Sequence, residues 1–464
     1  MIHCFKNNGY HIVMDVESGG VHVVDEITYD LIPLLEPLFD SEPTEEEVKS
    51  AAIKSGLPYP ADELAEAAAE IRELASEGML YTKDIYKEAI ESFQNREPVV
   101  KALCLHVAHD CNLACRYCFA EEGEYHGRRA IMSLEVGKKA LDFLVKSSGM
   151  RTNLEVDFFG GEPLMNWDVV KELVAYGRSL EEPFHKKFRF TLTTNGVLLN
   201  DEILQFVNEN MHNVVLSIDG RKDVNDHMRP FRGGQGSYDT IVPKFLKVAE
   251  SRGQEKYYVR GTYTHYNTDF SKDVLHLADL GFKQISVEPV VAEDSEAYAL
   301  RPEDVPKLCE EYDKLASEML RRRKEGKGFN FFHFMIDLSG GPCVYKRLSG
   351  CGSGTEYLAV TPWGDLYPCH QFVGQEEFCL GNVDDGIIRK DLTEQFGRCN
   401  VYTKESCKTC FAKYYCSGGC MANSQHFTGD INGTYEIGCQ LQKKRIECAI
   451  MMQAAMSEDL KEEE

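Results

Sequence analysis

Long apolar runs are missing from this sequence. No stretch approaches the ~20 consecutive apolar residues that a membrane-spanning helix needs, and residues 1–16 lack the apolar core of a secretory signal. Basic charge is also scarce, because 51 Lys and Arg stand against 75 Asp and Glu, which gives a formal net charge of −24. Such a charge opposes non-specific binding to nucleic acid or to an anionic membrane. We therefore expect a cytoplasmic protein that binds no nucleic acid and no membrane.

Cysteine, by contrast, is abundant and unevenly distributed. Eleven of the 17 cysteines lie within residues 343–448, and three lie within residues 111–118. Thiols in a reducing compartment rarely form stable disulfides, whereas closely spaced thiolates bind soft metals well. The two concentrations of cysteine therefore predict metal centres rather than a disulfide framework.

The length of 464 residues is enough for about three domains. Residues 1–95 predict a separate winged-helix-like module, because extended stretches at 9–16 and 20–24 are joined by a turn and followed by helices. These helices are expected to open near residues 25, 41–45 and 60, where capping residues precede apolar periodicity. Polar residues 91–98 are the expected linker.

Residues 99–300 predict an α/β fold, a partial (β/α)6 barrel. Six β-rich runs alternate there with helical stretches, at residues 101–107, 153–159, 187–193, 213–218, 256–264 and 283–291. Ligand sites of such sheets lie at the carboxyl ends of the strands. A bridging region, 301–342, contains an expected helix at 305–324, and the cysteine-rich segment 343–464 follows with a C-terminal helix.

The first group of cysteines follows the first predicted strand directly. Cys111, Cys115 and Cys118 share one loop, so that three thiolates can converge on one centre. A 4Fe–4S cluster held by three cysteines keeps one iron free for a substrate or cofactor. A structural zinc ion would need a fourth protein ligand, which His109 could supply.

This loop resembles the signature of the radical S-adenosylmethionine (SAM) enzymes, Cys-x3-Cys-x2-Cys with an aromatic residue before the last cysteine. The resemblance implies that the three cysteines hold the cluster that cleaves S-adenosyl-L-methionine to a 5′-deoxyadenosyl radical. It assigns to the cofactor pocket Tyr117, Gly160, Gly161, Glu162, Pro163, Thr193, Asn195, Ser217, Asp219, Arg229 and Glu288. Of these, Glu162 can pair with the ammonium group of the methionine moiety, and Arg229 can pair with its carboxylate.

The C-terminal cysteines resemble the SPASM extension of radical enzymes that modify peptides, which carries two auxiliary 4Fe–4S clusters. The resemblance assigns one cluster to Cys407, Cys410, Cys416 and Cys439, and the other to Cys351, Cys369 and Cys420. Either Cys343 completes the second auxiliary cluster or its iron stays open for a substrate thiolate. The remaining cysteines are expected to be structural, namely Cys4, Cys104, Cys309, Cys379, Cys399 and Cys448.

The order of the three regions, with the runs 366–372 and 443–448, resembles the maturases of small six-cysteine (SCIFF) peptides, which are thioether-forming oxidoreductases of the sactipeptide type. The resemblance implies that the N-terminal module is a recognition element for the leader of a ribosomally made precursor peptide. It implies a thioether between a cysteine sulfur and the α-carbon of another residue, expected to be threonine. It also implies an electron donor such as ferredoxin or flavodoxin.

Several alternatives remain open at this stage. The N-terminal module could serve stability or dimerisation, and the enzyme could be an anaerobic sulfatase maturase or another SPASM peptide-modifying enzyme. Sulfatase maturases carry a catalytic aspartate beside an auxiliary cysteine, whereas here His370 and Gln371 follow Cys369. A zinc-rich binding protein and an electron-transfer iron–sulfur protein are the alternatives from other classes. The basic run 321–324 would fit an RNA-acting radical enzyme, but such a run is more typical of a solvated helix face.

Overall fold

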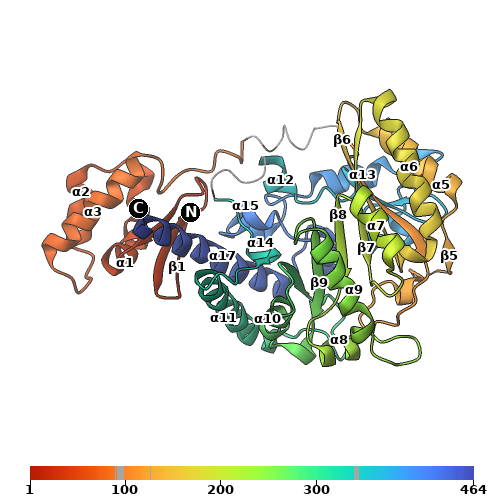
Figure 1. The fold of residues 1–464 in the computed structure, drawn as a ribbon. Coiled ribbons are helices and arrows are strands. Elements are labelled where there is room, and N and C mark those ends of the chain that lie inside the picture. The colour runs from red at the N-terminus through yellow and green to blue at the C-terminus, as the bar shows by residue number, and fades with distance from the viewer. Residues whose placement is uncertain (89, 91–98, 126, 339–343, 464) are drawn as a thin grey trace.

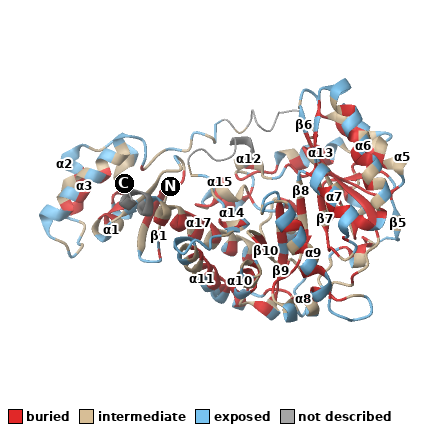
Figure 2. Cartoon of the chain, in the orientation of Figure 1, coloured by how far each residue is buried: buried red, intermediate tan, exposed pale blue. Residues whose placement is uncertain are grey.

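The computed structural model describes the chain apart from residues 89, 91–98, 126, 339–343 and 464. An N-terminal α/β module lies at one end of the molecule and an α/β barrel at the other (Figure 1). The expected linker and Cys343 lie outside the described residues. Buried residues concentrate in the strands and on the inner faces of the surrounding helices (Figure 2).

The N-terminal module is a three-stranded antiparallel sheet followed by three helices. Its strands, in spatial order, are β1 (Ile2–Asn7), β2 (Tyr10–Asp15) and β3 (Val21–Val24). Its helices are α1 (Glu26–Leu35), α2 (Glu45–Ile53) and α3 (Ala61–Ser76). The expected helix starts are confirmed, because Asp25 caps α1 and Thr44 forms a capping box with Glu47 at α2. The strand β1 was not predicted, since both of its faces mix apolar and polar residues.

Six parallel strands form the partial barrel and confirm the predicted α/β class. They are β4 (Ala102–His109), β6 (Asn153–Gly160), β7 (Lys187–Thr194), β8 (Asn213–Ser217), β9 (Tyr257–Tyr263) and β10 (Gln284–Pro289), paired in this order. The helices between them are α5 (Leu134–Ser147), α6 (Trp167–Phe184), α7 (Asp201–Asn210), α8 (Lys222–Met228), α9 (Tyr238–Ser251) and α10 (Ser271–Asp279). On β6, Leu154, Val156 and Phe158 are fully buried, whereas Asp157 and Phe159 alternate with them on the opposite face. This alternation leaves polar side chains on the inner face of the barrel.

The cysteine-rich region extends the same sheet. Its strand β12 (Tyr357–Val360) pairs in parallel with β4. The sheet then continues through β13 (Asp365–Tyr367), β14 (Gly381–Asn382) and β15 (Gly386–Ile387), with β11 (Asn330–Phe331) beside β10 and β5 (Ala130–Ile131) beside β4. Cys111 follows β4 and Cys369 follows β13, and both strands belong to this sheet. The sheet therefore carries the first cysteine loop and part of the C-terminal cysteine region.

The bridging region contains α11 (Val305–Lys324), as predicted, and this helix packs against the C-terminal helix α17 (Glu436–Glu463). The short helices between them are α12 (Val344–Ser349), α13 (Lys390–Arg398), α14 (Glu405–Lys408), α15 (Lys413–Cys416) and α16 (Met421–Thr428). The basic run of α11 makes local ion pairs, for example Arg321 with Glu318, as expected of a surface helix. Within the described parts of the chain, every helix is too short or too polar to cross a membrane.

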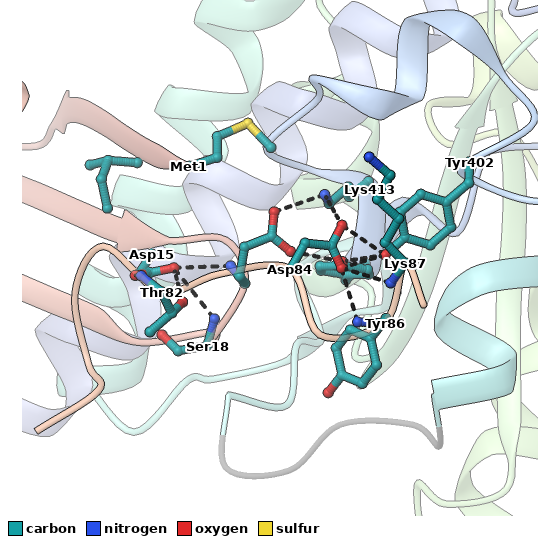
Figure 3. Close-up of polar contacts among 12 residues, drawn as sticks. Met1, Asp15, Ser18, Thr82, Asp84, Tyr86, Lys87, Tyr402 and Lys413 are labelled. Carbon is teal, nitrogen blue, oxygen red and sulfur yellow. Dashed lines mark hydrogen bonds and ion pairs between the residues drawn. The ribbon is translucent and has the colours of Figure 1, made fainter. Parts of the chain in front are cut away.

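A buried polar group, the Lys413 cluster, joins the N-terminal module to α15 (Figure 3). The Lys413 ammonium lies 2.8 Å from the Glu17 carboxylate and 3.4 Å from that of Asp84. The Tyr414 hydroxyl donates to Glu17 at 2.8 Å, and the Tyr402 hydroxyl donates to Asp84 at 2.7 Å. The side chains of Lys413 and Glu17 are only 3% and 6% exposed, so the ion pair lies out of water.

Candidate functional site

The carboxyl ends of the barrel strands surround a cavity of about 250 Å³, which we call the core cavity. Eleven of the residues predicted for the first site line it, namely Cys111, Cys115, Tyr117, Cys118, Gly160, Gly161, Thr193, Asn195, Ser217, Arg229 and Glu288. Glu162, Pro163 and Asp219 are not among its lining residues. The structure thus brings most of the predicted residues together and leaves these three behind the wall.

Backbone and amide contacts hold the loop that carries the first three cysteines. The Ala114 amide donates to the Pro230 carbonyl oxygen and the Arg116 amide to that of Met228, both at 2.9 Å. The Asn195 side-chain amide lies 3.5 Å from the Cys111 sulfur, to which it donates a hydrogen bond. The segment after α8 and the end of β7 therefore fix the loop at the mouth of the barrel.

Glu162 has a role that its motif did not reveal. Its carboxylate is fully buried and accepts hydrogen bonds from the Thr194 hydroxyl and the Asn195 amide at 2.8 Å, and from the Leu164 amide at 3.0 Å. Burial raises the pKa of Glu162 to about 7, although these donors oppose the shift. The carboxylate ties the end of β6 to the end of β7 and so positions Asn195 in the core cavity.

The two glycines before Glu162 are required by close backbone approach. A Cβ on Gly160 would lie 2.2 Å from the carbonyl oxygen of Ala108, and a Cβ on Gly161 would lie 2.2 Å from that of Asp110. The backbone of Gly160 also has a φ of 122°, which side chains rarely allow. These glycines let the end of β6 pack directly against the end of β4.

Arg229, Tyr117 and Asp219 form a buried chain of hydrogen bonds beside the cysteines. Arg229 donates to the Tyr117 hydroxyl at 2.8 Å, and this hydroxyl donates to the Asp219 carboxylate at 2.7 Å. Burial raises the pKa of Asp219 to about 6, while Arg229 and Tyr117 oppose the rise. Asp219 therefore acts behind the cavity wall, where it orients Tyr117 and with it the Arg229 guanidinium.

The residues of the core cavity fit a 4Fe–4S cluster with SAM beside it. Cys111, Cys115 and Cys118 are all free thiols. Arg229 is 8% exposed, and its Nε is buried without a hydrogen-bond partner in the described structure. A carboxylate in the cavity would satisfy this donor. Burial raises the pKa of Cys111 to about 12 and that of Cys115 to about 11, and bound iron would lower both.

The zinc alternative does not fit the geometry. His109 is not among the residues that line the core cavity, since its Nε2 lies 3.1 Å from Nδ1 of His106 and its ring stacks on Tyr125. Among the described residues, no three His, Cys, Asp or Glu side chains are arranged to hold a single metal ion. Cysteines of a 4Fe–4S cluster bind separate iron atoms and stand farther apart than the ligands of one zinc ion.

The structure places several of the described C-terminal cysteines near one another. Cys407, Cys410, Cys416 and Cys439 line one small cavity of about 50 Å³. Burial, together with the nearby thiols of Cys420 and Cys351, raises the pKa of Cys369 to about 12. Among the six cysteines expected to be structural, Cys104, Cys399 and Cys448 are buried.

A third cavity of about 390 Å³, which we call the bridging cavity, adjoins the core cavity and is lined by C-terminal cysteines. It shares Glu288, Pro289 and Val291 with the core cavity. Its other lining residues include three C-terminal cysteines and several polar residues, namely Cys416, Cys420, Cys439, His333, Asn423 and Arg445. A molecule that enters the bridging cavity therefore lies between the first cysteine loop and the C-terminal cysteines.

Sequence analysis missed several polar residues of this region. Arg260 lies on β9 and pairs with Glu288 at 2.9 Å, while His333 and Arg445 come from a helical turn and from α17. No motif surrounds Arg260 or His333, and Arg445 lies in the run 443–448, where the resemblance gave it no role. The one available signal was a charged residue, Arg260, at an alternating position of a predicted barrel strand.

Comparison with known proteins agrees with this geometry. Residues 105–280 match the model of the radical SAM superfamily. A cysteine-type anaerobic sulfatase-maturating enzyme of Clostridium novyi is 25% identical over 337 residues, which cover 68% of this chain and 86% of that protein. The structure of native anSMEcpe with bound AdoMet and Kp18Cys peptide has a TM-score of 0.64 at 20% identity and covers 78% of this chain and 100% of that one.

A second solved structure matches nearly the whole chain. Streptococcus suis SuiB bound to precursor peptide SuiA has a TM-score of 0.50 at 15% identity, and the match covers 92% of this chain and 96% of that one. At these identities the two solved structures establish a shared fold.

Proposed function

We propose that this radical SAM enzyme, which is related to the anaerobic sulfatase maturases, forms a thioether in a cysteine-rich precursor peptide made by the ribosome. The new bond joins a cysteine sulfur to the α-carbon of another residue, expected to be threonine. The main support is the bridging cavity, which shares three lining residues with the core cavity and is also lined by C-terminal cysteines. A peptide in this space can present one carbon to the first centre and one sulfur to the second.

The residues of the core cavity would hold the cofactors. A 4Fe–4S cluster and SAM, when bound, supply a 5′-deoxyadenosyl radical that removes a hydrogen atom from carbon. In this proposal the cysteines of residues 111–118 hold the cluster and Arg229 holds the carboxylate of SAM. Asn195 donates to the Cys111 sulfur.

The C-terminal region, residues 343–464, would serve as a SPASM domain with two auxiliary 4Fe–4S clusters. One has four cysteines that line a single cavity. The other has Cys351, Cys369 and Cys420, and its fourth position is left to Cys343 or to the substrate sulfur. Formation of the thioether removes two hydrogens from the peptide, one as a hydrogen atom from carbon and one as a proton from the thiol. The peptide also loses one electron when the carbon–sulfur bond forms. We expect ferredoxin or flavodoxin to be the class of electron carrier that exchanges electrons with the enzyme.

The N-terminal module, residues 1–95, would bind the leader of the precursor peptide. The described strand β3 pairs with β2 and forms the edge of its sheet. An extended peptide can add to such an edge through main-chain hydrogen bonds. SuiB, which shares the fold over most of the chain, has been solved with a precursor peptide. A stability or dimerisation module is the competing interpretation.

The test is anaerobic incubation of the reconstituted enzyme with SAM, a reductant and a synthetic candidate peptide, cysteine-rich and chosen from the reading frames near its gene. Mass spectrometry is expected to show a loss of two hydrogens that persists after reduction and blocks alkylation of one thiol. A disulfide would disappear on reduction. An unmodified peptide, under conditions in which SAM is cleaved, would contradict the proposal.

Oxidation of a cysteine in a sulfatase is the second candidate function. The similarity to the Clostridium novyi enzyme favours it. The presence of His370 and Gln371 in the core cavity, after Cys369, speaks against a catalytic aspartate at that position. Incubation with a sulfatase-derived cysteine peptide separates the two functions, because an aldehyde product reacts with a hydrazide and a thioether does not.

A further inference from the structure

The bridging cavity contains two buried polar atoms that have no hydrogen-bond partner in the described structure. One is Nη2 of Arg445, on α17, and the other is Oδ1 of Asn423, on α16. An unsatisfied buried donor or acceptor is costly, and native structures rarely keep one without a reason. Both atoms belong to residues that line the same cavity, which suggests that a bound molecule supplies their partners.

The Arg445 guanidinium is held rigidly by its remaining contacts. Its Nε donates to the Tyr312 hydroxyl at 2.7 Å, and its Nη1 donates to the Gln442 side chain at 3.4 Å. The guanidinium carbon lies 5.3 Å from the centre of the Tyr312 ring, and Tyr312 is itself fixed by the Tyr263 hydroxyl at 2.9 Å. Arg445 is only 7% exposed, so water has little access to its guanidinium. Its Nη2 is then the nitrogen that can donate to a ligand.

The charged groups across the cavity do not satisfy Arg445. Glu288 is engaged by Arg260 at 2.9 Å, and although burial would raise its pKa, Arg260, His333 and Arg445 lower it to about 2. Burial and the neighbouring Arg445 lower the pKa of His333 to about 3, so this imidazole is neutral. Arg445 thus remains a buried cation with a free donor, an arrangement that favours an added acceptor.

A peptide group matches the two free atoms, because it offers one carbonyl oxygen and one amide N–H. Resting on the proposed function, we propose that Arg445 and Asn423 bind the main chain of the precursor peptide in the bridging cavity. Arg445 Nη2 donates to a carbonyl oxygen of the peptide, and Asn423 Oδ1 accepts from one of its amides. Arg445 and Asn423 are then positioning residues for the segment that carries the reacting cysteine.

This form of recognition reads the backbone and not the side chains. The enzyme would accept changes in the residues that flank the reacting cysteine, provided that the peptide can stay extended. The leader and the core of the peptide would also bind at different places, the leader at the N-terminal module and the core in the bridging cavity. Loss of Arg445 should therefore weaken binding of a leaderless core peptide while binding of the isolated leader stays unchanged.

The first experiment measures fluorescence anisotropy of two labelled synthetic probes, the leaderless core and the isolated leader of the candidate cysteine-rich peptide. R445M and R445K are compared with R321M, a control on the surface of α11 that loses only local ion pairs. We expect R445M to weaken core binding about tenfold or more, because a hydrogen bond from a charged group is lost. R445K should recover part of this loss, and R321M should bind like the wild type.

The second experiment tests the main-chain contact itself. Core peptides with a single N-methylated amide, scanned around the cysteine, lose one N–H each. At one position the wild type should bind the methylated peptide several-fold more weakly, whereas N423A should show no further loss there. A merely structural role for Asn423 would leave the two losses additive at every position, which would overturn the proposal.

Iron content and the yield of 5′-deoxyadenosine without peptide are measured for every variant. The proposal requires the iron content of R445M to stay at the wild-type level, and the yield shows whether the first cluster is still reduced. Loss of iron, or unchanged core binding with intact clusters, would overturn it. Because these readouts are binding and cluster content, a peptide that binds through Arg445 without forming a thioether would contradict the proposed reaction alone.

Discussion

Replacing Lys413 with methionine is expected to weaken the attachment of the N-terminal module strongly. The change leaves the buried carboxylate of Glu17 and the partly buried carboxylate of Asp84 without their cation. Removing one partner of a buried ion pair costs about 3–5 kcal/mol. Since Tyr414 still donates to Glu17 and Tyr402 to Asp84, we expect the lower end, about 3 kcal/mol.

Hydrogen exchange of the β2 amides in the anaerobic holoprotein measures this loss as a free energy of local opening. Lys408→Met is the matched control, because the Lys408 and Glu405 side chains are 48% and 88% exposed and such pairs contribute at most about 1 kcal/mol. Adding Glu17→Gln to Lys413→Met should restore part of the stability, because one unpaired charge disappears. Equal exchange in the Lys413 and Lys408 variants, with equal iron content, would refute the reasoning.

Three further predictions address the barrel. Replacing all three cysteines of residues 111–118 with alanine should abolish formation of 5′-deoxyadenosine while the C-terminal clusters keep their iron; continued SAM cleavage, detected by chromatography, would show that the assignment is wrong. Gly161→Ala should destabilise by about 3 kcal/mol or more in chemical unfolding, since its Cβ would meet backbone at 2.2 Å, whereas Gly328→Ala has only an ordinary contact at 3.8 Å. Asp157→Asn should stabilise the protein at pH 7 by about 2–3 kcal/mol, because burial raises the Asp157 pKa to about 6 from about 3.9 in the unfolded chain. As the pH falls from 7 to 5 the two proteins should converge, and a constant difference in unfolding free energy over this range would contradict the assignment.

The parts of the fold that depend on local sequence were predictable. All six barrel strands are short β-rich runs between helical stretches, and the helix starts at Asp25 and Thr44 have capping side chains. The pairing of β12 with β4 was not predictable, because it joins segments about 250 residues apart and no local signal specifies the partner. The first strand, β1, is likewise defined by its pairing with β2.

In the candidate site, too, some residues were predictable from the sequence and others depend on the fold. The short spacing of residues 111–118 predicted that their three thiols share one loop, whereas the grouping of the C-terminal cysteines came from the resemblance to the SPASM extension. The motif containing Glu162 marked the correct region, but only the three-dimensional contacts reveal that its carboxylate holds Thr194 and Asn195. Arg445 lies in the run 443–448, but that run did not reveal its role, since its place in the bridging cavity depends on how α17 packs against α11.

The parallel pairing of β12 with β4 has a consequence for the order of folding. On the ribosome, β4 and the loop with the first three cysteines emerge long before residues 357–360. Until those residues arrive, one edge of β4 lacks its longest neighbour on that side, and an unpaired edge invites pairing with other chains. Pairing of such distant segments is slow, so the edge of β4 stays uncovered until β12 has been made and has paired with it. Chains truncated before β12 should therefore aggregate, with the loop of residues 111–118 exposed.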